Sequence, residues 1–356
     1  MDKASFFILN IFLNSYLAFF TVVFLVESVI YLFRIRQGRA AAILRMIPII
    51  KLPFDLCLYD FSRWSYSQGI NPLHCEEGTR MFSVMIGWLS EVTDWLFLPI
   101  NSKVGFTIHD GLTFTLADLV GYSINHMILK IFALLLISFT LGFVIRKLAL
   151  YYRSLLFVKS LNKNSQPLGK KLQNPFLSSC MKKFRVKVLT SPTLKGSPFV
   201  CGLTSPVVYI PEHLSKKLSG KEYEAVLAHE IEHVRYKDNA LRLTLDFIGT
   251  FFWWIPTKWL CKRIEEGQEV ECDLKCKKYG VDSNDLASAI IKSAKHSINT
   301  PNLTFSHQLA KQAILKRINL CLHPPVIRCK KIHFAFTCLG LVIAFLTIFP
   351  GRFWMF

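Results

Sequence analysis

Two histidines with the spacing of a helical metal site stand in the second half of the chain. His229 and His233 are four residues apart in the segment AHEIEHVRYKDN (228–239), and Glu230 directly follows the first of them. Because residues i and i+4 share one face of a helix, both imidazoles can reach the same metal ion. Glu230 lies beside that face, where its carboxylate can polarise a water molecule. This H-E-x-x-H pattern is typical of zinc peptidases.

The residues before the histidines predict the helix that carries them. Ser219 and Glu222 have the spacing of a capping box, so we expect a helix that begins near Gly220. Its middle then contains both histidines. A second helix is expected over EEGQEVECDLKCKKYG (265–280), with lysines in its last turn and Gly280 as its C-terminal cap.

A third ligand decides whether the histidines form a catalytic metal site. A catalytic zinc takes three protein ligands and keeps one position open, and His229, His233 and Glu269 would supply the three. Asp238 and Asp273 are then natural partners for the outer N–H groups of the rings. Taken alone, Glu269 and Asp273 would more simply form a solvated helix face. Their position after the histidine motif favours the ligand interpretation.

Four ordered blocks resemble the membrane metallopeptidase family of the beta-lactam-sensing receptors. They are SPFVCGLTSPVVYIP, AHEIEHVRYKDN, FFWWIPTKW and EVECD, all within residues 197–273, with a weaker similarity at LKRINLCL (315–322). The resemblance implies a gluzincin-like zinc peptidase domain, a downstream E-x-x-x-D helix, and the following roles: His229, His233 and Glu269 as zinc ligands, Glu230 as general base, and Asp238 and Asp273 as flanking acidic residues.

The family's sensing members continue past their last membrane helix into an extracellular ligand-binding domain. This sequence stops at Phe356, so we expect a chain without the C-terminal sensor domain. Two alternatives stay open. One is a non-catalytic zinc-containing signalling scaffold that pairs with a separate sensor protein. The other is a heat-shock or CAAX-type membrane protease, which the PFVCG and VVYIP blocks disfavour.

Composition points to a membrane protein. Hydrophobic residues make up 52% of the 356 residues, 30 of them are Phe, and the mean hydropathy is +0.34. A membrane-spanning helix needs about 20 apolar residues. We expect about four spans, at 5–33, 40–61, 119–145 and 332–351. The second is interrupted by charges and prolines and could instead be re-entrant or interfacial.

Charge distribution orients these spans. Residues 146–331 hold 32 Lys and Arg against 14 Asp and Glu, and Arg34, Arg36, Arg39 and Arg45 follow the first span. By the positive-inside rule both regions face the cytoplasm, where cysteines are reduced. Residues 61–118 have a net charge of −3 and are expected outside. The scattered basic residues match no nucleic-acid motif, so anionic lipids are the favoured partner of this charge.

Several segments carry further structural expectations. Short strands are expected at 186–190 and 198–210, and either 199–201 or 207–210 could offer an edge to a substrate backbone. Asp110 and Gly111 predict a hairpin turn. We expect a basic linker at 152–189, an amphipathic segment at 81–100, and an apolar segment at 241–260 that is buried or dips into the bilayer surface, because a crossing there would separate His233 from Glu269.

Other candidate residues lack a pattern that singles them out. His296, His307 and Arg317 could stabilise an oxyanion. Cys272 and Cys276 are spaced i and i+4 and could bind metal, but such a pair without further ligands more often packs as free thiols. Glu27, inside the first span, is expected at the interface or against another helix.

The combined prediction is a mainly helical, α+β, polytopic inner-membrane zinc endopeptidase. It has an N-terminal membrane domain (1–150), a cytoplasmic peptidase domain with a small sheet (151–331) and a C-terminal transmembrane helix (332–356). Zinc would polarise the scissile carbonyl, and Glu230 would move the proton. Its expected partners are a membrane-associated or cytoplasmic protein or peptide substrate and the lipid bilayer, with no nucleic acid. Proteolytic signal transduction is one compatible role.

Overall fold

The computed structural model describes residues 3–33, 35, 38–67, 106–108, 112–114, 126–167, 172–194, 196–298, 304–323 and 335. Its helices are α1 (Lys3–Leu32), α2 (Arg39–Ser67), α4 (His126–Lys163), α5 (Pro175–Phe184), α6 (Glu212–Lys217), α7 (Gly220–Tyr236), α8 (Asp238–Phe251), α9 (Thr257–Lys275), the short 3-10 helix η1 (Cys276–Tyr279), α10 (Ser283–Ile298) and α11 (Thr304–Leu322). Its strands are β1 (Phe106–Ile108), β2 (Leu112–Phe114), β3 (Gln166–Pro167), β4 (Lys187–Ser191), β5 (Phe199–Cys201) and β6 (Val207–Pro211). This mostly helical architecture with a small sheet agrees with the expected α+β class.

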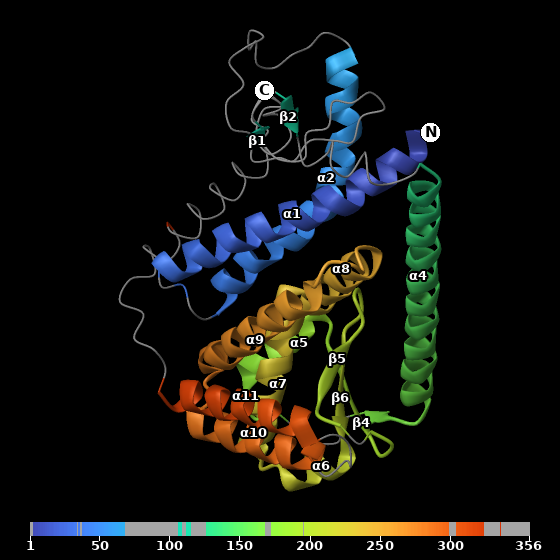
Figure 1. Ribbon diagram of the computed structural model, residues 1–356. Coiled ribbons are helices and arrows are strands. Elements are labelled where there is room, and N and C mark those ends of the chain that lie inside the picture. The colour runs from blue at the N-terminus through green and yellow to red at the C-terminus, as the bar shows by residue number, and fades with distance from the viewer. Residues whose placement is uncertain are drawn as a thin grey trace.

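The sheet beside α7 has four strands in the order β3-β4-β6-β5 (Figure 1). Strands β4 and β6 are parallel, whereas β3 and β5 pair antiparallel with their neighbours. The β5–β6 turn requires glycine: Gly202 has φ +99, and a Cβ there would lie 2.5 Å from the carbonyl oxygen of Ser205. Since β6 is paired on both sides, only β5 of the two expected strands is an edge strand.

Helix α7 packs against the sheet and lies at the centre of the hydrophobic core that it shares with the strands, α5, α6 and α10. Ser219 and Glu222 form the predicted capping box, and the helix begins at Gly220 as expected. Buried apolar side chains of α7 pack with those of the sheet and of α5, α6 and α10: Leu177, Val188, Val208, Ile210, Leu214, Tyr223, Leu227, Ile231 and Leu286. This packing holds α7 rigidly along the length that contains the histidines.

Helices α8 and α9 form a hairpin that returns the chain to α7. The segment 241–260 is therefore not one element: α8 ends at Phe251, and α9 begins at Thr257 directly after Pro256. The expected helix over 265–280 is also longer at its start and shorter at its end, because the last turn tightens into η1 before Gly280. Because α8 and α9 both contact α7, the two ends of the segment 241–260 lie near the same helix. A metal site shared by His233 and Glu269 requires this arrangement.

Helices α1 and α2 form a second hairpin, and α2 packs against α8 and α9 (Figure 1). Helix α2 continues through Pro48 and Pro53. The shared apolar cluster comprises Phe19, Ala42, Met46, Ile49, Leu52, Leu245, Phe252, Ile255, Leu260 and Ile264. Glu27 faces other helices, as one expectation proposed: its carboxylate accepts hydrogen bonds from Arg45 (Nε, 2.7 Å) and Arg263 (Nη1, 3.2 Å).

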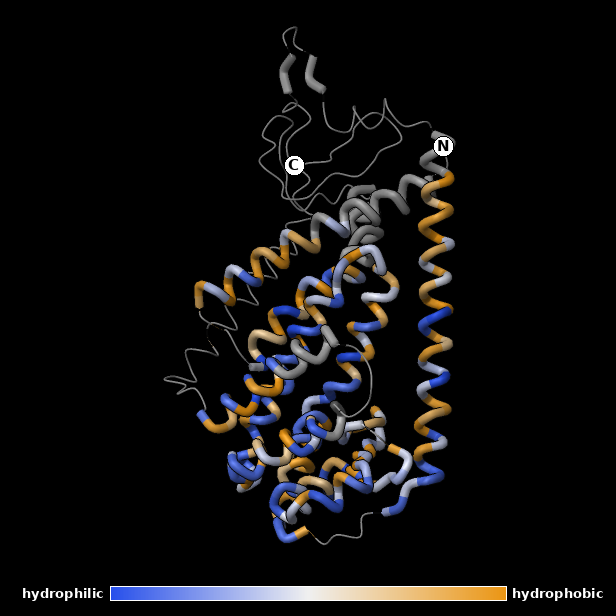
Figure 2. Tube along the Cα trace, turned by 60° about the horizontal axis from the view of Figure 1, so that its bottom comes forward, coloured by the Kyte–Doolittle hydropathy of each residue, from blue (hydrophilic) through white to orange (hydrophobic). Residues whose placement is uncertain are grey.

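Helix α4 stands at the side of the molecule (Figure 1), and Figure 2 shows long hydrophobic stretches along it. Within the described residues, Ile131–Lys163 is the one helix long and apolar enough to cross a membrane, and Phe19–Leu32 is a shorter apolar helix. The structure thus supports one of the four expected spans. The expected linker at 152–189 is wrong over most of its length: α4 runs to Lys163, since no glycine or proline lies between 152 and 163, and β3, α5 and the start of β4 follow. Leu161 then packs against Tyr209 of the sheet.

The strands β1 and β2 pair antiparallel, with Ile108 opposite Leu112, which agrees with the predicted hairpin. The amphipathic segment 81–100 lies outside the described residues. So does the C-terminal span 332–356, apart from residue 335.

The ion pair between Glu222 and Lys292 predicts a pH-dependent stability. Glu222 is buried and accepts from Lys292 (Nζ, 2.6 Å), from Ser288 and from the Ser219 backbone. Although burial opposes ionisation, these donors lower the pKa of Glu222 to about 2. We expect Glu222→Gln to lower the free energy of unfolding by about 1–3 kcal/mol at pH 7.

Because the folded-state pKa of Glu222 is depressed, this stabilisation is present above its usual pKa of 4.5 and is lost as the pH falls toward 2. The difference between wild type and variant should shrink over that range in detergent-solubilised unfolding curves. Glu212→Gln, at an exposed pair with Lys216, serves as the control and should change the stability by less than about 0.5 kcal/mol. A difference that persists unchanged at pH 2 would contradict the assignment.

Candidate metal centre

Two imidazoles on one face of α7 point at the same place. His229 and His233 are one helical turn apart, both buried, with their Nε2 atoms 3.2 Å apart. Their rings meet edge to face, with centroids 4.8 Å apart. The capped, packed helix fixes the spacing of the two histidines on its face.

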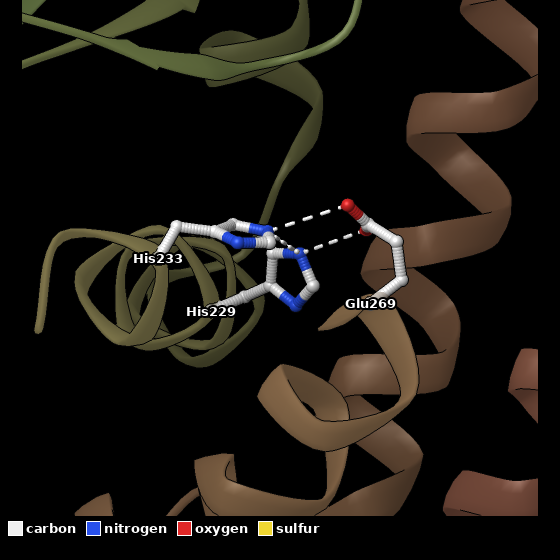
Figure 3. A group of neighbouring side chains, drawn as sticks. All are labelled: His229, His233 and Glu269. Atoms are coloured by element: carbon white, nitrogen blue, oxygen red, sulfur yellow. Dashed lines mark hydrogen bonds and ion pairs between the residues drawn. The ribbon is translucent and has the colours of Figure 1, made fainter. Parts of the chain in front are cut away.

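Glu269 of α9 completes a triangle of donor atoms (Figure 3). Its Oε2 lies 3.3 Å from His229 Nε2, and its Oε1 lies 3.4 Å from His233 Nε2. A metal with bonds of 2.0–2.1 Å to tetrahedral ligands separates those ligands by about 3.3 Å. The three residues therefore have the donor types and the mutual spacing that suit zinc. Glu269 keeps 27% of its side chain exposed, so the centre is open to solvent on that side.

Each histidine has a carboxylate behind it. His229 Nδ1 lies 2.9 Å from Asp273 Oδ1, and His233 Nδ1 lies 2.9 Å from Asp238 Oδ2. Both aspartates are almost fully buried. The two predicted acidic partners thus lie beside the ring nitrogens that face away from Glu269. Asp238 is hydrogen-bonded to His233, the arrangement that fixes tautomer and orientation in histidine metal sites, and Asp273 lies within ion-pair distance of His229.

Three arginines from three helices neutralise these acidic groups. Arg317 of α11 donates to both oxygens of Asp273 (2.7 and 2.9 Å) and lies 3.0 Å from Glu269. Arg242 of α8 donates to Glu269 (2.9 Å), and Arg39 of α2 donates to Asp238. Sequence reasoning grouped Arg317 with His296 and His307. The structure brings Arg317 to the centre, whereas the side chains of the two histidines lie outside the described residues.

Arg242 and Arg39 were missed as site residues. Arg39 entered the sequence argument only through the charge rule, and Arg242 did not enter it. The signal for Arg317 was its place in LKRINLCL. No local pattern marks the other two, because each reaches the centre only through the packing of its helix against α7 or α9.

The ring of charges shifts the titration of the centre. Burial disfavours a charged imidazole, yet Asp273, Cys276 and Glu269 raise the pKa of His229 well above its usual value. Burial likewise opposes charge on His233, but Asp238, Cys272 and Glu269 raise its pKa to about 11. Burial also opposes ionisation of Glu269, which both histidines and Arg317 outweigh, so its pKa is well below the usual range. Zinc binds the neutral imidazole, so ring protonation and metal binding compete at this centre.

The two glutamates of the HEIEH motif occupy different environments. Glu232 is fully buried and accepts hydrogen bonds from Tyr279 (Oη, 2.7 Å) and Arg235 (Nη1, 3.1 Å), so it is part of the helix packing. Burial raises the pKa of Glu230, and the positive charges of His229 and His233 oppose that rise. Glu230 is therefore the glutamate electrostatically coupled to the centre.

Cys272 on α9 and Cys276 at the start of η1 are buried free thiols, as the packing interpretation expected. Cys272 Sγ nevertheless lies 3.5 Å from His233 Nδ1 and 4.0 Å from Asp238. His233, Asp238 and Cys272 thus form a second group of potential ligands, on the far side of the same ring. Because His233 Nδ1 is already hydrogen-bonded to Asp238, we assign Cys272 to the packing behind the centre.

Comparison with known proteins places this geometry in a family. The model of the BlaR1 peptidase M56 family matches residues 121–321, which include α7, α9 and Arg317. The chain belongs to the BlaR1 peptidase M56 family. The regulatory protein BlaR1 of Bacillus licheniformis is 30% identical over 138 residues, which is 37% of this chain and 22% of that protein. Membership in the M56 family and this similarity support a membrane-associated chain with a metallopeptidase-type domain.

The M56 match does not extend to α1 and α2, although α2 supplies Arg39 to the centre. The part of the site outside the family match must therefore be understood from the structure of this chain.

Glu269 provides a test of the third ligand position. Replacing it with Gln removes the carboxylate charge and should lower the zinc content of the purified protein by about tenfold or more at limiting zinc. The matched control is Glu271→Gln, because Glu271 lies two residues away on α9 and pairs with Lys275 instead (3.2 Å). Zinc content measured by metal analysis should be unchanged in this control. Equal losses in both variants would contradict the assignment.

Proposed function

We propose that this chain is a membrane-associated zinc endopeptidase in which His229, His233 and Glu269 bind the metal. The observation that carries the proposal is the convergence of two imidazoles of α7 and one carboxylate of α9, with each Nε2 atom 3.2–3.4 Å from the other Nε2 and from one oxygen of Glu269. A zinc ion bound there would act as a Lewis acid toward the scissile carbonyl and lower the pKa of a water molecule. Family membership supports the same chemistry.

Glu230 is the proposed general base. It follows His229 on a rigid helix, and burial raises its pKa despite the opposing charges of His229, His233 and Arg317. In this role it accepts a proton from the attacking water and transfers it to the leaving amine. Asp273 and Asp238 hold the rings of His229 and His233 in orientation.

Strand β5 is the proposed binding edge for the substrate. It is the edge strand beyond β6 and contacts α7. An extended peptide that pairs with such an edge passes alongside the metal helix, with main-chain hydrogen bonds for affinity. The backbone carbonyl oxygen of Val200 in β5 accepts a hydrogen bond from Asn239 Nδ2 (2.9 Å), so this acceptor on the edge strand is directed away from β6. The substrate class that fits is an unfolded or flexible protein segment near the bilayer.

The test of catalysis compares two glutamates of α7. Glu230→Gln should retain zinc, because all three ligands remain, and should lower peptide hydrolysis by about 10²- to 10⁴-fold. Glu232→Gln preserves an acceptor for Tyr279 and should retain activity. His229→Ala should lose both zinc and activity. The measurements are zinc content and casein turnover by the full chain in detergent.

A zinc-loaded wild type that cleaves nothing, together with unchanged cellular substrate profiles in the Glu230→Gln strain, would instead support the non-catalytic scaffold. That scaffold would pair with a separate sensor protein.

We further propose that the peptidase half faces the cytoplasm, on the basis of the +18 net charge of residues 146–331. The β5–β6 turn is suited to a test because Leu203 is 60% exposed. A protease recognition site inserted after Leu203 should be cut in inverted membrane vesicles and protected in intact spheroplasts. Cleavage in intact spheroplasts would reverse the orientation.

A further inference from the structure

Arg39 connects the α1–α2 hairpin to the metal centre. It is the first residue of α2, and its Nη2 donates to Asp238 Oδ1 and to the carbonyl oxygen of Tyr236 (3.3 Å). Its guanidinium also lies over the Tyr236 ring, 3.6 Å from the centroid. These contacts join α2 to the junction between α7 and α8, immediately after His233.

The carboxylate of Asp238 is divided between this arginine and the metal centre. Oδ2 lies 2.9 Å from His233 Nδ1, while Oδ1 accepts from Arg39. Asp238 has no exposed surface, so its charge needs a buried or half-buried cation. Arg39 supplies that charge and also restricts how the carboxylate can rotate. The orientation of the His233 ring therefore depends on a residue outside the peptidase fold.

The backbone of the same loop touches the helix that carries Glu269. A Cβ on Gly267 would lie 3.0 Å from the carbonyl oxygen of Gly38 and 3.2 Å from Ala42 Cβ. Gly38 itself has φ +92, a conformation suited to glycine. The start of α2 thus abuts α9 two residues before Glu269, so any shift of α2 along α9 changes the distance from Arg39 to Asp238.

We propose that Arg39 is a positioning residue for the metal centre, through which the α1–α2 hairpin controls the orientation of His233. This inference rests on the proposed function, because it assumes that His233 is a zinc ligand. It makes the position of the hairpin a determinant of the geometry at the candidate metal centre. A shift of the hairpin would act on the buried carboxylate of Asp238 instead of on the zinc ligands themselves.

A second arginine of α2 provides a matched control. Arg45 lies further along the same helix and pairs with Glu27 (2.7 Å), away from Asp238. Arg39→Gln and Arg45→Gln each remove one positive charge from α2 and break one ion pair that this helix makes. Only the first removes a contact to the carboxylate behind His233, so the pair separates positioning from simple loosening of the hairpin.

The experiment measures zinc affinity of the purified full-length chain in detergent by competition with a chromophoric chelator. Loss of a residue that orients a metal ligand from behind typically weakens metal binding 10- to 100-fold, and we expect that loss for Arg39→Gln. Arg45→Gln should stay within about threefold of wild type, and Arg39→Lys should recover part of the loss. The visible absorption of bound Co²⁺, which reports ligand geometry, should change in Arg39→Gln alone.

Wild-type affinity and an unchanged Co²⁺ spectrum in Arg39→Gln would overturn the proposal, as would an equal loss in Arg45→Gln. If Arg39→Gln does not fold, Arg39→Met, which replaces the guanidinium with an unbranched apolar side chain, is judged by the same criteria. A wild-type chain that binds no zinc, or a His229→Ala variant that binds it normally, would instead overturn the proposed function.

Discussion

The contact between α7 and α9 is the constraint on which the rest of the structure depends. It places one carboxylate, Glu269, against two imidazoles that lie one helical turn apart. Groups of this kind lose their hydration when they are buried, and the loss must be offset by charges and hydrogen bonds inside the protein. The surrounding helices provide those compensating groups.

The compensating charges come from widely separated parts of the chain. Arg317 reaches Asp273 and Glu269 from α11, Arg242 reaches Glu269 from α8, and Arg39 reaches Asp238 from α2. Removing one member of such a network leaves a buried partner uncompensated, which costs more than the loss of an exposed pair. The candidate metal centre is thus also a structural junction. The N-terminal hairpin and α11 both contribute cations to it.

The sheet has a different relation to the centre. Its strands contribute none of the donor atoms described above, but they bury the opposite face of α7 and leave β5 as an edge beside it. A rigid helix between a packed sheet and an open coordination side is a suitable platform for chemistry on an extended chain. The end of helix α4 packs against the sheet. Leu161 contacts Tyr209, and Asn162 Oδ1 accepts a hydrogen bond from the Tyr209 hydroxyl.

The amino-acid sequence by itself determined the local features of this protein. The capping box at Ser219, the shared face of His229 and His233 and the α+β class follow from spacing and residue type, which act over one or two helical turns. The family blocks also pointed to Glu269. The sequence was a poorer guide to helix boundaries: α4 extends into the expected linker, and 241–260 divides into parts of two helices. Only the tertiary structure decided that Arg242 and Arg39 belong to the centre, and that β5 instead of β6 is the edge. The ion pair between Arg39 of α2 and Asp238 of α8 joins residues 199 positions apart, and no local pattern encodes such a contact, because it depends on how whole helices pack.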